Sequence, residues 1–396
     1  MVLVPGVLQQ QAINNSINAI ATYDIDFTVP VVKGGNVTLN TNGNAAPATD
    51  LFRYGAVRYT SSYVENADGS VSSRVATCMR SNNRGLWVEQ DRTNECLYNR
   101  DLTNAAWVKS NVTAAKNQTG VDNVSNAASS ITATAGNGTI LQTITSATST
   151  NRITSAFVKR ISGSGTLEMT QDNGSTWTTV TVTSSWTRVE VPYAALANPV
   201  VGFRIGTSGD SFAVDFVQEE KGNTISGPLA TTSSTFRGWG DRHTADDSGG
   251  SYLSPVAAVF RGGHGFFMEL CSARIEQSGP LVSSAGPQCR INTDGSVSYS
   301  DNASHSVQTA AGQFTRGRFT VNRIAGYIHS TGDIAICCNG NSPVTATTGT
   351  LSPSMSHIDL ATNGSLGMSI HGLVRRIAIF GNGVLTTAML QQFTVL

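Results

Sequence analysis

The feature that most constrains this chain is the regular return of short apolar runs separated by turn residues. Residues 154–159 alternate apolar and polar side chains, and residues 167–170 do so before an Asn-Gly turn at Asn173 and Gly174. Strict alternation places successive side chains on opposite faces of a strand, and Asn-Gly supplies the positive φ angles of a tight turn. The pattern therefore predicts an all-β fold of antiparallel sheets.

The same pattern continues to the end of the chain. A second Asn-Gly turn, at 339–340, follows an apolar run, and a short helix is expected over residues 386–392. We also expect residues 177–182 to pair with residues 186–191 as a hairpin, with its turn at residues 183–185. Strands recurring about every ten to fifteen residues are typical of β-sandwiches, because each strand buries one face against the opposite sheet.

Composition excludes two classes of function. Charged residues make up only 13% of the sequence, against about 25% in average domains, and the formal net charge is zero. Nucleic-acid binding needs clustered positive charge, so we expect no nucleic-acid partner. No apolar stretch approaches the length of a membrane span, so we expect no membrane insertion. The first lysine is Lys33, so the start lacks the basic residues of a secretory signal, and we expect synthesis in the cytoplasm.

The N-terminal segment carries one amphipathic stripe. Ile13, Ile17 and Ile20 recur at helical spacing on an otherwise polar, uncharged stretch. A lone short helix is marginal without a partner surface. Two alternatives follow: the stripe packs on its own chain, or it is an attachment helix that anchors the protein in a neighbouring subunit.

A polar, aperiodic stretch at residues 226–235 suggests a boundary between folded modules. We therefore expect an N-terminal attachment region, a first sandwich, a linker and a second sandwich. Their expected boundaries are 1–99, 100–225, 226–251 and 252–396.

The acidic residues do not predict a catalytic centre. Glycoside hydrolysis would need two carboxylates flanking a cleft. The candidates are Glu168, Asp172, Glu190, Glu219 and Glu220. Glu168 and Glu190 fall at outward positions of expected strands, and Glu219 and Glu220 fall at a strand end. We interpret all of them as solvated surface and predict no catalytic residue and no enzyme.

The sequence also predicts no metal site and no cofactor. The densest polar cluster is Asp241, His243, Asp246 and Asp247, which lies beside the polar stretch and lacks the glycine-fixed spacing of a calcium loop. We interpret it as a solvated linker. The six cysteines form no CxxC pair, and we expect most of them to be buried as small hydrophobic residues.

A resemblance to a known family is carried by residues 85–99, GLWVEQDRTNECLYN, and continues through residues 104–109, 185–188 and 216–222. This set resembles a segment recurrent in bacteriophage tail-fibre and particle-surface proteins. There, a "VE…RTN…L" stretch introduces a jelly-roll module of the carbohydrate-binding type. The resemblance implies such a module over the first expected sandwich.

The C-terminal part is similar to concanavalin-like or laminin-G-like domains. The resemblance is carried by the turn at 339–340, by residues 369–377 and by a closing helix over residues 385–390. The C-terminal loops hold no acidic cluster that matches a calcium site of that family. The resemblance therefore implies a second sandwich, but it does not imply a bound calcium ion.

These resemblances imply a structural virion protein, most simply a tail-fibre or receptor-binding component that contacts host cell-surface polysaccharide. Such a protein would lie on the virion surface, bind other virion proteins through its N-terminal region and form a homotrimer. A capsid decoration or head-fibre protein is the alternative. A polysaccharide depolymerase is a weaker one, because the chain shows no long β-helix repeat.

Candidate sugar contacts follow from the turns and the aromatic residues. We expect Trp107 and Trp186 in the core and Trp177, beside the Asn173 turn, on the surface. The candidate carbohydrate-binding residues are Trp177, Asn173, Asn339 and His371, the last two on segments that carry the C-terminal resemblance.

Overall fold

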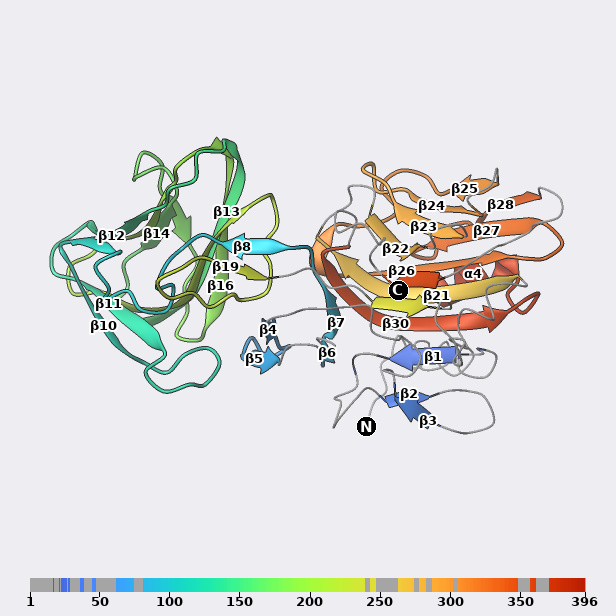
Figure 1. Ribbon diagram of the computed structural model, residues 1–396, viewed down its shortest axis with the longest axis horizontal. Coiled ribbons are helices and arrows are strands. Elements are labelled where there is room, and N and C mark those ends of the chain that lie inside the picture. The colour runs from blue at the N-terminus through green and yellow to red at the C-terminus, as the bar shows by residue number, and fades with distance from the viewer. Residues whose placement is uncertain are drawn as a thin grey trace. The chain divides into compact units, whose positions relative to one another are not determined.

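The computed structural model shows an all-β protein, as the sequence predicted. It describes residues 17, 21, 23–26, 28, 36–38, 45–47, 62–74, 81–238, 243–246, 263–273, 278–282, 287–301, 305–347, 357–360 and 370–395. Contacts divide the chain into two compact units, and Figure 1 labels their strands. Unit 1 comprises residues 1–58, 77–90 and 240–396, and unit 2 comprises residues 59–76 and 91–239.

Unit 2 is built on two five-stranded antiparallel sheets. We call β15-β14-β17-β12-β9 the platform sheet and β10-β11-β18-β13-β16 the covered sheet. Their strands are β9 (Val108–Ser110), β10 (Val112–Gln118), β11 (Ala128–Ala133), β12 (Gly138–Thr143), β13 (Thr150–Ser162), β14 (Leu167–Thr170), β15 (Thr178–Val180), β16 (Thr187–Leu196), β17 (Val200–Ile205) and β18 (Ser211–Lys221).

The two sheets of unit 2 enclose one hydrophobic core. Met169 and Phe203 of the platform sheet and Val158 and Phe212 of the covered sheet belong to one buried cluster. Full burial of such side chains contributes about 1.5–3 kcal/mol each. Trp107 is buried in the same cluster, as expected from the sequence. Unit 2 is therefore a β-sandwich.

The expected hairpin of residues 177–182 with 186–191 is wrong. β15 pairs with β14 in the platform sheet, whereas β16 pairs with β13 in the covered sheet. Residues 181–186 thus carry the chain from one sheet to the other. Alternation specifies that a strand has one buried face, but it does not specify the partner strand.

Two short antiparallel pairs complete unit 2. β4 (Ser62–Glu65) pairs with β5 (Val71–Arg74), and Val71 packs with Phe157 and Phe216 of the covered sheet. β8 (Arg92–Asn94) pairs with β19 (Phe236–Gly238). The chain therefore enters and leaves the larger segment of unit 2 on paired strands.

The first part of the expected linker, 226–251, is packed into unit 2 and is not a free connection between modules. Ser226 and Leu229 are buried. The backbone amide of Leu229 donates to Gln218 Oε1 at 2.5 Å, and that of Ser226 donates to Glu220 Oε2 at 3.0 Å. Polar composition concealed this packing, because the segment is held by hydrogen bonds to buried side chains and carries no periodic apolar stripe.

Unit 1 contains a ten-stranded sheet and a six-stranded sheet. The ten-stranded sheet follows the path β28-β27-β26-β21-β30-β1-β2-β3, with β7 also pairing with β30 and β6 pairing with β7. The six-stranded sheet has the order β20-β29-β22-β23-β24-β25. Its strands are β1 (Tyr23–Asp26), β2 (Asn36–Thr38), β3 (Ala45–Pro47), β6 (Ser81–Asn82), β7 (Gly85–Val88), β20 (His243–Asp246), β21 (His264–Ser272), β22 (Ser278–Val282), β23 (Gln288–Ile291), β24 (Val297–Ser300), β25 (Ser306–Gln308), β26 (Gly317–Ile328), β27 (Asp333–Cys338), β28 (Val344–Thr347), β29 (His357–Leu360) and β30 (Gly372–Gly381).

The ten-stranded sheet of unit 1 is buried on both faces. Phe266 on one face packs with Tyr299 of the six-stranded sheet. Phe267 on the other face packs with Phe393 of helix α4 (Thr387–Thr394), which confirms the helix expected near the end of the chain. Figure 1 shows α4 beside β26 and β27, with which it makes contacts.

The adjacent cysteines of β27 point to opposite faces, as expected. Cys338 lies in the cluster between the sheets, and Cys337 lies in the cluster beneath α4. In the described ranges, the cysteines are free and buried, and burial raises the pKa of each thiol. They therefore act as small hydrophobic residues; Cys78 lies outside these ranges.

Of the three isoleucines in the N-terminal stripe, the structure describes Ile17 alone. Ile17 is helical, its carbonyl accepts a hydrogen bond from Ala21 N at 2.9 Å, and its side chain is fully buried in the cluster beneath α4. Ile17 thus packs on its own chain, the first of the two alternatives. Ile13 and Ile20 lie outside the described residues. Of the helices described, none has the length and apolar character needed to cross a membrane.

The units group the chain differently from the boundaries expected at residues 99, 225 and 251. β1 and β7, both in the expected N-terminal region, pair with β30 near the C-terminus. Such pairing joins segments almost the whole chain apart. Local sequence patterns carry no information about it.

Candidate functional site

The outer face of the platform sheet carries a row of polar side chains in register. Glu168 lies opposite Thr179 on one side and opposite Arg204 on the other, and Thr139 lies between Arg204 and Ser110. Residues directly opposite each other project from the same face. All five are half-buried or exposed, while Leu167, Met169, Phe203, Ile205 and Ile140, which flank Glu168, Arg204 and Thr139 along their strands, belong to the core. We call these five residues the polar row.

An apolar row lies beside the polar row. Gly202 lies opposite Leu141, and Leu141 lies opposite Val108, each two residues along its strand from a member of the polar row. Leu141 is half-buried and the Val108 residue is 67% exposed. We call Gly202, Leu141 and Val108 the apolar row. The face thus offers hydrogen-bonding groups beside an apolar strip.

Arg204 is fixed at the centre of the polar row. Its Nε donates to Glu168 Oε2 at 2.6 Å, and its guanidinium carbon lies 4.6 Å from the centre of the Trp177 ring. The hydrogen bond that Arg204 donates to Glu168 raises the pKa of Arg204 above its usual range. One cation, one carboxylate and one aromatic ring therefore form a neutral group on this face.

The turn that follows β14 positions Trp177. Asn173 and Gly174 have φ angles of 60° and 80°, as the Asn-Gly sequence predicted. A Cβ atom on Gly174 would lie 3.0 Å from the Trp177 ring, so the glycine allows the ring to lie against the turn. Asn173 is exposed and Trp177 is half-buried.

Asp172 holds the turn together as an ionised carboxylate. Its oxygens accept hydrogen bonds from Thr176 N at 2.8 Å, Thr170 Oγ1 at 2.8 Å and Tyr193 Oη at 3.1 Å. Burial opposes ionisation, but these hydrogen bonds outweigh it and lower the pKa of Asp172. Tyr193 belongs to β16, so Asp172 also ties the turn to the covered sheet.

The four candidate sugar contacts do not form one site. Trp177 and Asn173 share the turn in unit 2, whereas Asn339 and His371 belong to unit 1. The Asn339 amide is used internally: its Oδ1 accepts from Arg323 N at 2.8 Å, and its Nδ2 donates to a backbone carbonyl at 2.9 Å. His371 is buried, with 2% of its surface exposed. The platform face therefore has two of the four.

The interpretation of all five carboxylates as solvated surface is wrong for Glu219 and Glu220. Both side chains are fully buried, whereas Glu190 is exposed as expected. β18 extends to Lys221, and its end is enclosed by β8 and by the segment around Ser226. The charge of Glu219 and Glu220 suggested a solvated strand end, and the enclosing segments could not be anticipated from local sequence.

The Glu219 carboxylate lies inside the end of the sandwich, beside a fully buried arginine. Thr154 Oγ1 donates to it, and Arg152 Nη1 lies 3.5 Å from it and 2.7 Å from Glu95 Oε2. Burial raises the pKa of Glu219 to about 7, and the favourable contacts with Thr154 and Arg152 only partly oppose this. Burial likewise raises the pKa of Glu220.

The RTN segment has a structural role at this end of the sandwich. Asn94 Nδ2 donates to the carbonyls of Val217 and Leu229 at 3.0 and 3.1 Å. Asn94 Oδ1 accepts from the backbone amides of Cys96 and Glu219 at 3.0 and 3.1 Å. One buried side chain thus joins β8, β18 and the segment around Leu229. The sequence resemblance identified this segment, but only the structure shows what it does.

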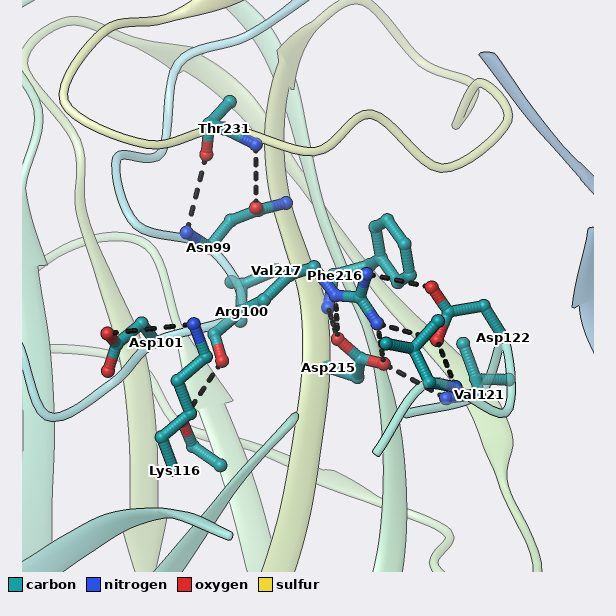
Figure 2. A network of polar contacts seen from close by, with 12 residues as sticks. Asn99, Arg100, Asp101, Lys116, Val121, Asp122, Asp215, Phe216, Val217 and Thr231 are labelled. Carbon is teal, nitrogen blue, oxygen red and sulfur yellow. Dashed lines mark hydrogen bonds and ion pairs between the residues drawn. The ribbon is translucent and has the colours of Figure 1, made fainter. Parts of the chain in front are cut away.

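A second polar network lies on the covered sheet, and Figure 2 shows it from close by. The Arg100 guanidinium donates to both oxygens of Asp122, each at 2.8 Å, and to those of Asp215 at 2.7 and 3.0 Å. It also lies 4.0 Å from the centre of the Phe216 ring. Each charged oxygen has a donor, so this network fixes the fold and offers no open site.

The residues that the structure describes contain no group of three or more His, Cys, Asp or Glu side chains that could hold a metal ion. His243 and Asp246 lie on β20, which pairs with β29. Asp241 and Asp247 lie outside the described residues.

Neither a family model nor a curated protein matches the chain. Solved structures give distant likenesses. The carbohydrate-binding module CBM40 of the Ruminococcus gnavus IT-sialidase, bound to alpha2,3 sialyllactose, is 12% identical, with 39% of this chain and 92% of that chain covered and a TM-score of 0.31.

Two further likenesses are of the same kind. The CBM22-1 xylan-binding domain of Paenibacillus barcinonensis Xyn10C is 13% identical, with 35% of this chain and 99% of that chain covered and a TM-score of 0.26. The receptor-binding domain of botulinum neurotoxin type G is 9% identical, with 38% and 41% covered and a TM-score of 0.24. The chain is distantly similar to such β-sandwiches, and at these TM-scores we infer no ligand from the likeness.

Proposed function

We propose that this chain is a non-catalytic glycan-binding protein whose contact surface is the outer face of the platform sheet. The observation that carries the proposal is the arrangement on that face: the polar row, the apolar row beside it and Trp177 at their margin. A sugar ring has hydroxyl groups at its edge and C–H groups on its face. It therefore needs hydrogen-bonding groups and an apolar or aromatic surface side by side.

The carboxylates support binding without catalysis. Glycoside hydrolysis needs one carboxyl group as acid and a second as base or nucleophile, both facing the sugar. On the platform face Glu168 is held in an ion pair, and Asp172 accepts three hydrogen bonds within its turn. Glu219, whose raised pKa would suit a general acid, is sealed inside the sandwich. We therefore propose that the protein is not an enzyme.

The wider role that we propose is a structural protein on the surface of a bacteriophage or phage-like particle, in the manner of a tail fibre or receptor-binding protein. Its support is the sequence resemblance of residues 85–99. In this role the N-terminal region would bind other virion proteins, and a homotrimer would present several glycan-binding faces together. Linked sites multiply a modest single-site affinity.

Binding of the purified chain to envelope polysaccharide of candidate bacterial hosts tests the proposed face. We expect Trp177→Ala to lower retention on immobilised polysaccharide by about tenfold, because it removes the aromatic surface. Phe319→Ala is the matched control: Phe319 is a 40%-exposed aromatic residue of unit 1 whose ring also stacks on an arginine, Arg84, at 4.0 Å. An equal loss of retention in both variants, or no loss of retention in either, would contradict the assignment to the platform face.

Electron microscopy of particles with this chain labelled tests the wider role. A position at the tail tip or fibre supports receptor binding. A position spread over the capsid would support the alternative, a capsid decoration or head-fibre protein, and absence from particles would contradict both.

A further inference from the structure

The platform face also indicates the chemical class of its ligand. We infer that it takes an uncharged, extended glycan whose chain runs across the strands along the polar row; this inference rests on the proposed function.

The direction follows from the register. The polar row has one member on each of the five strands of the platform sheet. Neighbouring strands lie about 4.8 Å apart, so the row extends for about 19 Å. Each step is close to the length of one sugar unit. A linear chain lying across the strands can therefore meet a new side chain at each unit, whereas a chain lying along one strand cannot.

The apolar row runs parallel to the polar row, and its accessible side chains are those of Leu141, which is half-buried, and Val108, which is exposed; Gly202 itself is buried. A glycine between Leu141 and Thr170 leaves no side chain on the central strand at this level. Trp177 lies two residues before Thr179, so it belongs to the same face at one end of this strip, and Val108 lies at the other. Sugar C–H faces can rest on this strip while hydroxyl groups reach the polar row.

The charges of the face exclude an acidic ligand. The cation of the polar row, Arg204, is neutralised by Glu168 at 2.6 Å, and Trp177 lies against it. Asp172, in the adjoining turn, is a carboxylate whose hydrogen bonds hold it in the ionised form. A sugar carboxylate would meet a compensated arginine and a nearby negative charge. Uncharged hydroxyl groups meet no such penalty.

The test compares uncharged and acidic oligosaccharides on one array and by titration calorimetry. The uncharged set is linear neutral oligosaccharides of two to about six units, which brackets the length of about four or five units that the row could span at its strand spacing. The acidic set is oligogalacturonides and sialyllactose. We expect affinity for neutral chains to rise with length until the row is filled, and acidic chains to bind at least about tenfold more weakly.

A charge variant sharpens the test. Glu168→Gln leaves Arg204 uncompensated, so we expect binding of acidic chains to increase by about tenfold and to weaken again at high salt. Glu190→Gln is the matched control, because Glu190 is an exposed residue of β16 in the other sheet. This substitution should change the affinity for neither the uncharged nor the acidic set.

The outcomes separate the two proposals. If neither set binds, the proposed function of this face is wrong. If acidic chains bind better than neutral ones, or if affinity does not depend on chain length, glycan binding stands but this inference is overturned.

Discussion

At the scale of single residues, Asn94 shows how one buried amide can hold a module together. Its four hydrogen bonds join three segments that are distant in the sequence. Asn94→Ala would leave two backbone amides and two carbonyls without these partners, so we expect unit 2 to lose about 3 kcal/mol of unfolding free energy. Denaturant unfolding followed by tryptophan fluorescence measures this. Asn117→Ala, at an exposed position of β10, is the control, and an equal effect of both substitutions would contradict the prediction.

Glu219 gives a prediction about pH. Burial raises its pKa from 4.5 to about 7 in the folded chain, so the folded state favours the protonated form. Protonated Glu219 makes its full contribution to stability at a pH below 4.5, the pKa in the unfolded chain. That contribution is lost as the pH rises through about 7, the pKa in the folded chain. We expect the unfolding free energy of unit 2 to fall by about 3 kcal/mol between these pH values.

Glu219→Gln isolates that effect, because glutamine does not titrate. The difference in unfolding free energy between the variant and the native chain should grow as the pH is raised from 4.5 to 7. Thr113→Val, at an exposed position with no titratable group, should give a difference that does not change with pH. A pH-independent difference for Glu219→Gln would contradict the burial argument.

Residue-level predictions from sequence succeeded where the determinant is local. The Asn173 turn formed because Asn and Gly adopt positive φ angles without help from the rest of the chain. Trp186, expected in the core, is half-buried with Lys159 4.9 Å from the centre of its ring. The burial of Glu219 was missed, because it is decided by segments more than a hundred residues away in sequence, such as Asn94.

At the scale of elements, strand existence was predictable and strand partnership was not. Alternation marked β14 and β16 correctly. It could not show that β16 joins β13 while β15 joins β14. The rows of the platform face arise from these pairings, so the candidate site could be predicted only as far as Trp177 and its turn.

Gly202 offers a test of the platform sheet. A Cβ atom at this position would lie 2.0 Å from the Ile140 carbonyl oxygen of the neighbouring strand. We expect Gly202→Ala to destabilise unit 2 by about 2 kcal/mol through this overlap and to weaken glycan binding by distorting both rows.

The control for Gly202 is Gly209→Ala. Gly209 has a φ of 84°, and a Cβ atom there would have no neighbour within 4 Å. Its substitution should lower stability only by the conformational term, about 1 kcal/mol, and should leave glycan binding unchanged. Loss of binding in both variants would show that the platform rows are not the determinant.

At the scale of the whole molecule, the chain alternates between two units. Residues 59–76 belong to unit 2, residues 77–90 belong to unit 1, and residues 91–239 form the larger segment of unit 2. β8 and β19 lie at the start and end of this larger segment and pair with each other. Unit 2 therefore has the topology of an insertion into unit 1.

This topology predicts that unit 2 has its full stability in isolation only when residues 59–76 are included. The hairpin β4–β5 covers Phe157 and Phe216 on the covered sheet. A chain of residues 59–239, with residues 77–90 replaced by a Gly-Ser linker of equal length, should therefore retain cooperative unfolding and glycan binding. A chain of residues 91–239 exposes both phenylalanines and should be less stable by about 3 kcal/mol. Calorimetry of the two chains measures the difference, and equal stability would mean that the hairpin adds nothing to the module.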